Sequence, residues 1–125
     1  SGRAFMSETR IDAECELQDI NHDLLSQIGL LAPFGSMNPE PVFCIRGVKV
    51  QAPSVVGNNH LRMRVSSNGA SCNTIWFSKG HLISALADST LDIAFTPQFN
   101  PWNGSSTIQL KMRDVARTTS NRTPR

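Results

Sequence analysis

The sequence lacks the features that would indicate a secreted, membrane-bound or disulfide-stabilised protein. Its longest uncharged apolar run is far shorter than the about 20 residues that a membrane-spanning helix needs. Residues 1–10 contain no apolar segment of the kind that a secretory signal has. The three cysteines, Cys15, Cys44 and Cys72, are odd in number and widely separated. We therefore expect no membrane association and reduced thiols, as in a cytoplasmic protein.

Motifs for catalysis and metal binding are missing as well. The chain has no GxSxG elbow, no P-loop and no glycine-rich dinucleotide fingerprint. Its three histidines show no spacing of metal ligands. Beyond residue 40 the carboxylates are Asp88, Asp92 and Asp114, on separate predicted elements, whereas a two-metal nuclease gathers several ligands around ions about 4 Å apart. We expect a chain that is not catalytic by itself and that holds no metal or cofactor.

Charged residues are few and unevenly distributed. Of the 125 residues, 39% are apolar and 18% are charged, which is typical of one globular domain with its own core. Residues 1–40 hold seven acidic and two basic residues, whereas residues 41–125 hold ten basic and three acidic residues. A basic body behind an acidic lead-in favours a polyanion among the candidate partners.

Residues 60–77 read as two strands joined by a Ser-Asn-Gly turn, which is a strong signal for a β-hairpin. Alternation gives the first strand an apolar face and a basic face, formed by Leu61, Met63 and Val65 and by His60, Arg62 and Arg64, respectively. In the second strand we expect Ile75 and Phe77 to face the core and Trp76 to face solvent. An exposed tryptophan beside guanidinium groups suits a protein that binds single strands. The alternative is that Trp76 packs beneath a loop and that the arginines are ordinary solvated charges.

The rest of the chain predicts a small barrel. We expect a short strand or linker at 11–17, a helix at 20–31, a rigid connector at 33–41, a strand at 42–50 whose register changes at Gly47, and a connector at 53–59. A short helix at 80–87, a strand at 91–95 stopped by Pro97, a turn at 99–104 and a strand at 108–113 follow. A mainly β chain with about five antiparallel strands and a helix between the third and fourth is the pattern of an OB-fold, a Greek-key barrel.

These elements divide the chain into three parts. Residues 1–10 are expected to be disordered or introduced by cloning, residues 11–116 to form the OB domain with its lead-in helix, and residues 117–125 to be a disordered basic tail. The candidate nucleic-acid-binding residues are those with outward basic, aromatic or imidazole side chains: Lys49, His60, Arg62, Arg64, Trp76, Lys79, Trp102, Lys111 and Arg113.

Four stretches of the chain are similar to a known family. These are PFGSMNPEPVF, VGNNHLRMRV, TIWFSKG and FNPWNGSSTIQLKMRDV. In this order they resemble the OB-fold domain of RecJ-type single-stranded-DNA-specific exonucleases, of the DHH phosphoesterase family, over about residues 11–115. The first stretch is the most specific, although Met37 stands where the family commonly has a glycine, so the backbone of that turn is expected to differ.

The resemblance implies that the chain is a C-terminal part of an enzyme that degrades single-stranded DNA from the 5′ end in DNA repair and recombination. Its partners would be single-stranded DNA and the DHH and DHHA1 domains of the same parent chain, in which Mn²⁺ or Mg²⁺ would be bound. No catalytic residue of the family has a counterpart here. The alternative function is an OB module that docks on the rest of the enzyme, or on a partner protein, without direct contact to DNA.

Overall fold

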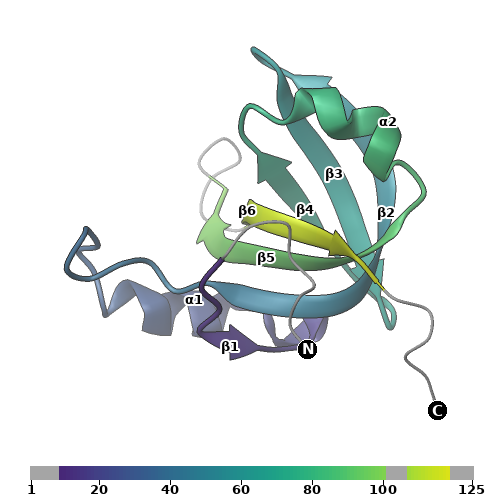
Figure 1. Cartoon of the computed structure of the whole chain (residues 1–125). Helices are drawn as coiled ribbons and strands as arrows, with labels where there is room; N and C mark the ends of the chain where they lie inside the picture. The colour runs from purple at the N-terminus through teal and green to yellow at the C-terminus, as the bar shows by residue number, and fades with distance from the viewer. Residues whose placement is uncertain (1–8, 101–106, 119–125) are drawn as a thin grey trace.

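The computed structural model, which describes residues 9–100 and 107–118, is built around a closed five-stranded barrel (Figure 1). The strands are β2 (Phe43–Val56), β3 (His60–Ser67), β4 (Ala70–Trp76), β5 (Thr90–Phe99) and β6 (Ile108–Arg117). They pair in the order β2-β3-β4-β6-β5, and β5 pairs back to β2. The β4–β6 pair is parallel and the other barrel pairs are antiparallel. This is the predicted OB-fold.

Short elements lie outside the barrel strands. The two-residue strand β1 (Ala13–Glu14) pairs in parallel with the start of β2. It is followed by the 3₁₀-helix η1 (Leu17–Asp19) and the helix α1 (His22–Gly29), which is shorter than the predicted 20–31. The 3₁₀-helix η2 (Gly80–Leu82) and the helix α2 (Ile83–Leu86) connect β4 to β5, where a helix was expected. None of the helices in the described residues has the length and hydropathy needed to span a bilayer.

The long strand β2 bends so that it can pair with both β5 and β3. Its register with β5 shifts between Ile45 and Val48, and Gly47 between them has a φ of +76°, which confirms the predicted change of register. The prediction of a connector at 53–59 is wrong for its first half. The strand continues to Val56 through a second irregularity, so that only residues 57–59 form the turn to β3.

The β3–β4 turn fixes which side chains enter the core. Asn68 and Gly69 have φ values of +52° and +85°, as a two-residue hairpin turn requires. Counting back from that turn pairs Leu61 with Trp76, so Trp76 faces the interior beside Leu61 and is 6% exposed. The prediction that Trp76 faces solvent and Phe77 the core is therefore wrong. Phe77 is 51% exposed.

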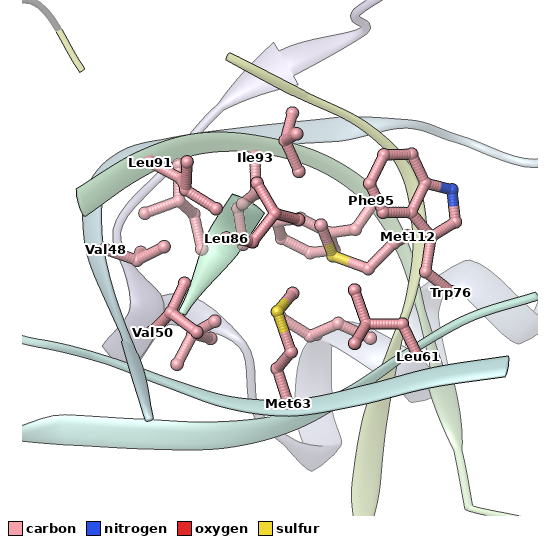
Figure 2. Packing of buried hydrophobic residues seen from close by; sticks show 14 of the residues in the cluster. Val48, Val50, Leu61, Met63, Trp76, Leu86, Leu91, Ile93, Phe95 and Met112 are labelled. Carbon is pink, nitrogen blue, oxygen red and sulfur yellow. The ribbon is translucent and has the colours of Figure 1, made fainter. Parts of the chain in front are cut away.

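The barrel interior is filled by side chains from all five strands. Figure 2 shows Val48, Val50, Leu61, Met63, Trp76, Leu91, Ile93, Phe95 and Met112 converging on one another, with Leu86 entering from α2. Leu17 of η1 belongs to the same cluster. The acidic lead-in is therefore attached to the barrel through an apolar contact.

Strands β5 and β6 are longer than predicted. The prediction that Pro97 stops its strand is wrong, because β5 continues to Phe99 and pairs Pro97 with Leu110. The pairing of β5 with β2 ends at Phe95, so the proline lies where β5 has a neighbour on one side only. A proline is tolerated at such an edge position because no second ladder needs its missing N–H. Arg117, placed in the tail by the prediction, is the last residue of β6.

Candidate nucleic-acid interface

The outward side chains of the hairpin and β6 form successive rows across neighbouring strands. In one row Arg62 of β3 lies beside Ile75 of β4, and Ile75 lies beside Lys111 of β6. Ile75 is only 6% exposed, although its position in the alternation of β4 is the outward one. In the next row Arg64 lies beside Asn73. We call this surface, together with the outward side chain of Lys49 on the neighbouring strand β2, the hairpin face. It follows from the alternation of β3, which was predicted, and from the turn, which sets the phase of β4.

Three cations of the hairpin face are not paired with carboxylates. Arg64 donates hydrogen bonds to Asn73 Oδ1 at 3.0 Å and to Ser71 Oγ at 2.7 Å, and both acceptors are neutral. Within residues 9–100 and 107–118, the exposed side chains of Arg62 and Lys49 make no ion pair. Lys49 of β2 lies one row beyond Arg64, since its partner on β3 is Ser66. The face therefore presents a line of three positive charges.

Two further predicted cations, Lys111 and Arg113, form ion pairs with Glu40, which was not among the predicted site residues. Glu40 Oε1 accepts hydrogen bonds from Lys111 Nζ at 3.1 Å and from Arg113 Nη2 at 2.8 Å. Arg113 also donates from Nε to Thr96 Oγ1 at 3.2 Å. Glu40 belongs to the connector at 33–41, which was predicted to be a rigid link. One carboxylate thus compensates part of the charge of two cations.

The start of β3 carries an aromatic cluster. The backbone N–H of Ser78 donates to His60 Nδ1 at 3.0 Å, and the His60 ring meets the Phe77 ring edge-on with centroids 5.1 Å apart. Lys79 Nζ lies 5.5 Å from the centre of the Trp76 ring, within reach of a cation–π contact. Trp76 is therefore a core residue with a lysine over its ring, and the exposed aromatic surface here is that of Phe77.

The turn before β3 is held against the turn after β4. The N–H of Gly80 donates to the carbonyl of Asn59 at 2.9 Å. A Cβ at Gly80 would lie 2.5 Å from Asn59 Oδ1, which is closer than packed atoms approach. This close contact keeps His60 and Lys79 at the same end of the barrel.

Trp102, the one predicted site residue not yet placed, lies outside the described residues.

Metal ligands and thiols are the groups of the described residues whose chemistry can be assessed directly. No group of three or more His, Cys, Asp or Glu side chains in them could hold a metal ion. Burial raises the pKa of Cys15, Cys44 and Cys72 to about 11 each. Such thiols remain protonated near neutral pH and are poor nucleophiles.

Comparisons with known proteins agree with the OB-fold of the chain. Residues 11–114 match the family model described as the RecJ OB domain. The chain is 25% identical over 115 residues to the single-stranded-DNA-specific exonuclease RecJ of Bacillus subtilis (strain 168). The match covers 90% of the chain but 15% of that relative, so the chain spans a small part of the relative's length.

Two solved structures share the fold at low sequence identity. An aspartyl-tRNA synthetase structure from Leishmania major Friedlin superposes with a TM-score of 0.53 and 14% identity, covering 99% of this chain and 24% of that one. The aspartyl-tRNA synthetase of Entamoeba histolytica gives a TM-score of 0.50, also at 14% identity, over 94% of this chain and 27% of the other. At this identity the likeness concerns the fold alone.

Proposed function

This chain belongs to the RecJ OB domain family, and from that premise we propose that it is the single-stranded-DNA-binding module of a RecJ-type exonuclease. In this proposal the whole protein degrades single-stranded DNA from its 5′ end during repair and recombination in a bacterial cytoplasm. The reaction belongs to DHH and DHHA1 domains with Mn²⁺ or Mg²⁺, and the present chain grips the strand. The relative from B. subtilis, which carries the name of such an exonuclease, supports the proposal.

The observation that carries the proposal is the line of Arg62, Arg64 and Lys49 on the hairpin face. Outward residues two positions apart on a strand are about 7 Å apart, so successive cations can contact successive phosphates. Each contact releases condensed counterions, which supplies affinity without reading sequence. OB-folds bind oligonucleotides on the corresponding strands.

Aromatic stacking is the second part of the proposed interface. Phe77 takes the role that the sequence assigned to Trp76, because its ring is exposed and the His60 ring supports it from the side. Every base has a π-face, so stacking on Phe77 would tolerate any sequence. Lys79, Lys111 and Arg113 lie at the margin of this surface, and Glu40 competes with phosphate for the last two.

A salt titration of oligonucleotide binding tests the proposal. Three phosphate contacts predict that the logarithm of the association constant falls with log[salt] at a slope of about −2, since each contact to a single strand contributes about −0.7. Arg62→Ala and Arg64→Ala should each flatten the slope by about 0.7. Arg117→Ala is the matched control, because that arginine bonds to neutral acceptors on Ala85 and Ser89. Salt-insensitive binding, or equal effects of all three substitutions, would contradict the proposal.

Docking on another domain is the second candidate function. Leu30, Leu31 and Met37 are 84%, 60% and 96% exposed. Leu30 and Leu31 directly follow α1, and Met37 precedes Asn38, whose side-chain amide donates to the Leu31 carbonyl at 2.8 Å. Apolar side chains so close in sequence and so exposed are suited to a protein contact. Met37→Lys in the whole enzyme should then weaken association between this domain and the rest of the protein. Unchanged oligonucleotide binding by Met37→Lys in the isolated chain would show that the two functions use different surfaces.

A further inference from the structure

A hollow of about 420 Å³ lies between the lead-in helical segment and the β3–β4 hairpin. Its apolar lining comes from Leu17, Ile20, Cys72 and Ile108. Its polar lining includes Arg64 and Asn73 of the hairpin face, so the hollow adjoins the line of cations described above. The volume is within the range of pockets that enclose small organic groups.

The polar groups of the hollow suit a planar, uncharged ring that is linked to an anionic group. Arg64 is fixed by Ser71 and Asn73, and its charge is not compensated by a carboxylate. Because Asn73 Oδ1 accepts from Arg64, the amide N–H groups of Asn73 are the donors left for a ligand. The described lining residues include no carboxylate. A nucleobase fits this description, with an apolar face and acceptors on its edge.

Two other hollows among the described residues suit such a ligand less well. The one of about 600 Å³ beside Arg10 and Arg113 also contains the carboxylate of Glu40, which repels a phosphate. The one of about 540 Å³ beside Lys49 is lined by small and polar residues, many of them in or next to the hairpin turn, and has no large apolar side chain to contact a base. Ser71 lines both this hollow and the one beside Arg64.

We propose that the hollow beside Arg64 is a subsite for one base of the bound single strand, with the phosphate of that nucleotide on Arg64. The proposal rests on the proposed function and deepens it, because it adds the lead-in segment to the interface. The base contacts Ile20 and the apolar floor, and it accepts hydrogen bonds from Asn73. Since every base carries an acceptor, the subsite is tolerant of sequence.

Two isoleucines provide a matched test. Ile20 and Ile83 are both half-buried and both pack against the barrel core, but only Ile20 lines the hollow. Ile20→Ala in the 125-residue chain should weaken binding of a dT oligonucleotide about fivefold, measured by fluorescence anisotropy, whereas Ile83→Ala should leave it unchanged. In a second set of oligonucleotides, each nucleotide in turn is replaced by an abasic unit. Replacement at one position should weaken binding to the wild-type chain but should not weaken binding to Ile20→Ala any further.

A second measurement on the wild-type chain does not depend on the folding of variants. On titration with the same oligonucleotide, the amide resonances of residues 20–22 and 71–73 should shift together with those of β3. Shifts confined to β3, or equal losses in the two isoleucine variants, would overturn the subsite while leaving the proposed function intact. Absence of salt-dependent binding by wild type would instead overturn the proposed function.

Discussion

The carboxylate of Glu40 lies 2.8 Å from the guanidinium of Arg113, although 73 residues separate them in the sequence. The same oxygen accepts from Lys111, so one acid of the connector holds two cations of β6. These side chains are about one-third exposed, and such pairs contribute about 1 kcal/mol or less to stability. Their main consequence in our proposal is electrostatic, because Glu40 occupies the place that a phosphate would take.

Glu40→Gln should therefore strengthen oligonucleotide binding. Removing the negative charge frees Lys111 and Arg113, which should raise affinity several-fold at low salt and steepen the salt slope by up to about 1.4. Anisotropy titrations at several salt concentrations measure both quantities. Glu14→Gln is the control, because Glu14 pairs with Arg46 at 3.1 Å outside the hairpin face. Weaker binding by Glu40→Gln would show that Glu40 positions these cations rather than competing with phosphate.

Phe77→Ala and Trp76→Ala should separate binding from stability. Phe77 is half-exposed, so its loss should lower the free energy of unfolding by less than about 1 kcal/mol while weakening binding by about 1–3 kcal/mol. Trp76 is buried in the core, so its loss should cost about 3–5 kcal/mol of stability. Urea unfolding and anisotropy on both variants measure these effects. The reverse pattern would restore Trp76 as the stacking residue.

Asp92→Ala should destabilise the bend of β2. The buried carboxylate of Asp92 accepts from the N–H of Gly47 at 3.0 Å, from Thr118 Oγ1 at 2.8 Å and from Arg46 at 3.2 Å. Its removal leaves the Gly47 N–H without that acceptor, which should cost about 3 kcal/mol in urea unfolding.

Glu14→Ala serves as the comparison for Asp92→Ala, since it removes the more exposed partner of Arg46. We expect it to cost less than about 1 kcal/mol. Equal losses in the two variants would mean that the ion pair, rather than the acceptor for the bend, sets the stability.

The buried thiols predict a loss of stability at alkaline pH. Burial raises the pKa of each thiol to about 11 in the folded chain, compared with an ordinary value of 9.0 for an exposed cysteine. From pH 9 to 11 the unfolded state therefore binds fewer protons than the folded state, so the free energy of unfolding falls as pH rises. Urea unfolding should show a shallower fall for Cys72→Ala than for wild type over this window and the same pH dependence for both below pH 8. An unchanged fall would exclude Cys72 as a contributor.

Part of this molecule could be predicted from the sequence because the signals are local. The alternation of β3 gives the outward Arg62 and Arg64, and Gly47 marks the change of register. The phase of β4 was wrong because it was set by the apolar residues Ile75 and Phe77. Counting outward along both strands from a two-residue Asn68-Gly69 turn pairs Leu61 with Trp76. The phase of β4 could therefore have been predicted from the position of the turn in the sequence.

Other features depend on contacts that the sequence does not reveal. The ion pairs of Glu40 join the connector to β6 across more than 70 residues. Pro97 is tolerated in β5 because the pairing with β2 ends two residues earlier, which is a property of the closed barrel. The hollow beside Arg64 exists because Leu17 draws the lead-in against the hairpin.

Closure of the barrel also bears on how this chain behaves in solution. In the described part of the chain, each of the five barrel strands pairs with a neighbour on both sides. The free edges that remain are short, such as the end of β5 beyond Phe95, so few unpaired N–H and C=O groups are offered to a second molecule and edge-to-edge aggregation is disfavoured. Titrations at the high protein concentrations that weak binding requires should then report on the ligand rather than on self-association.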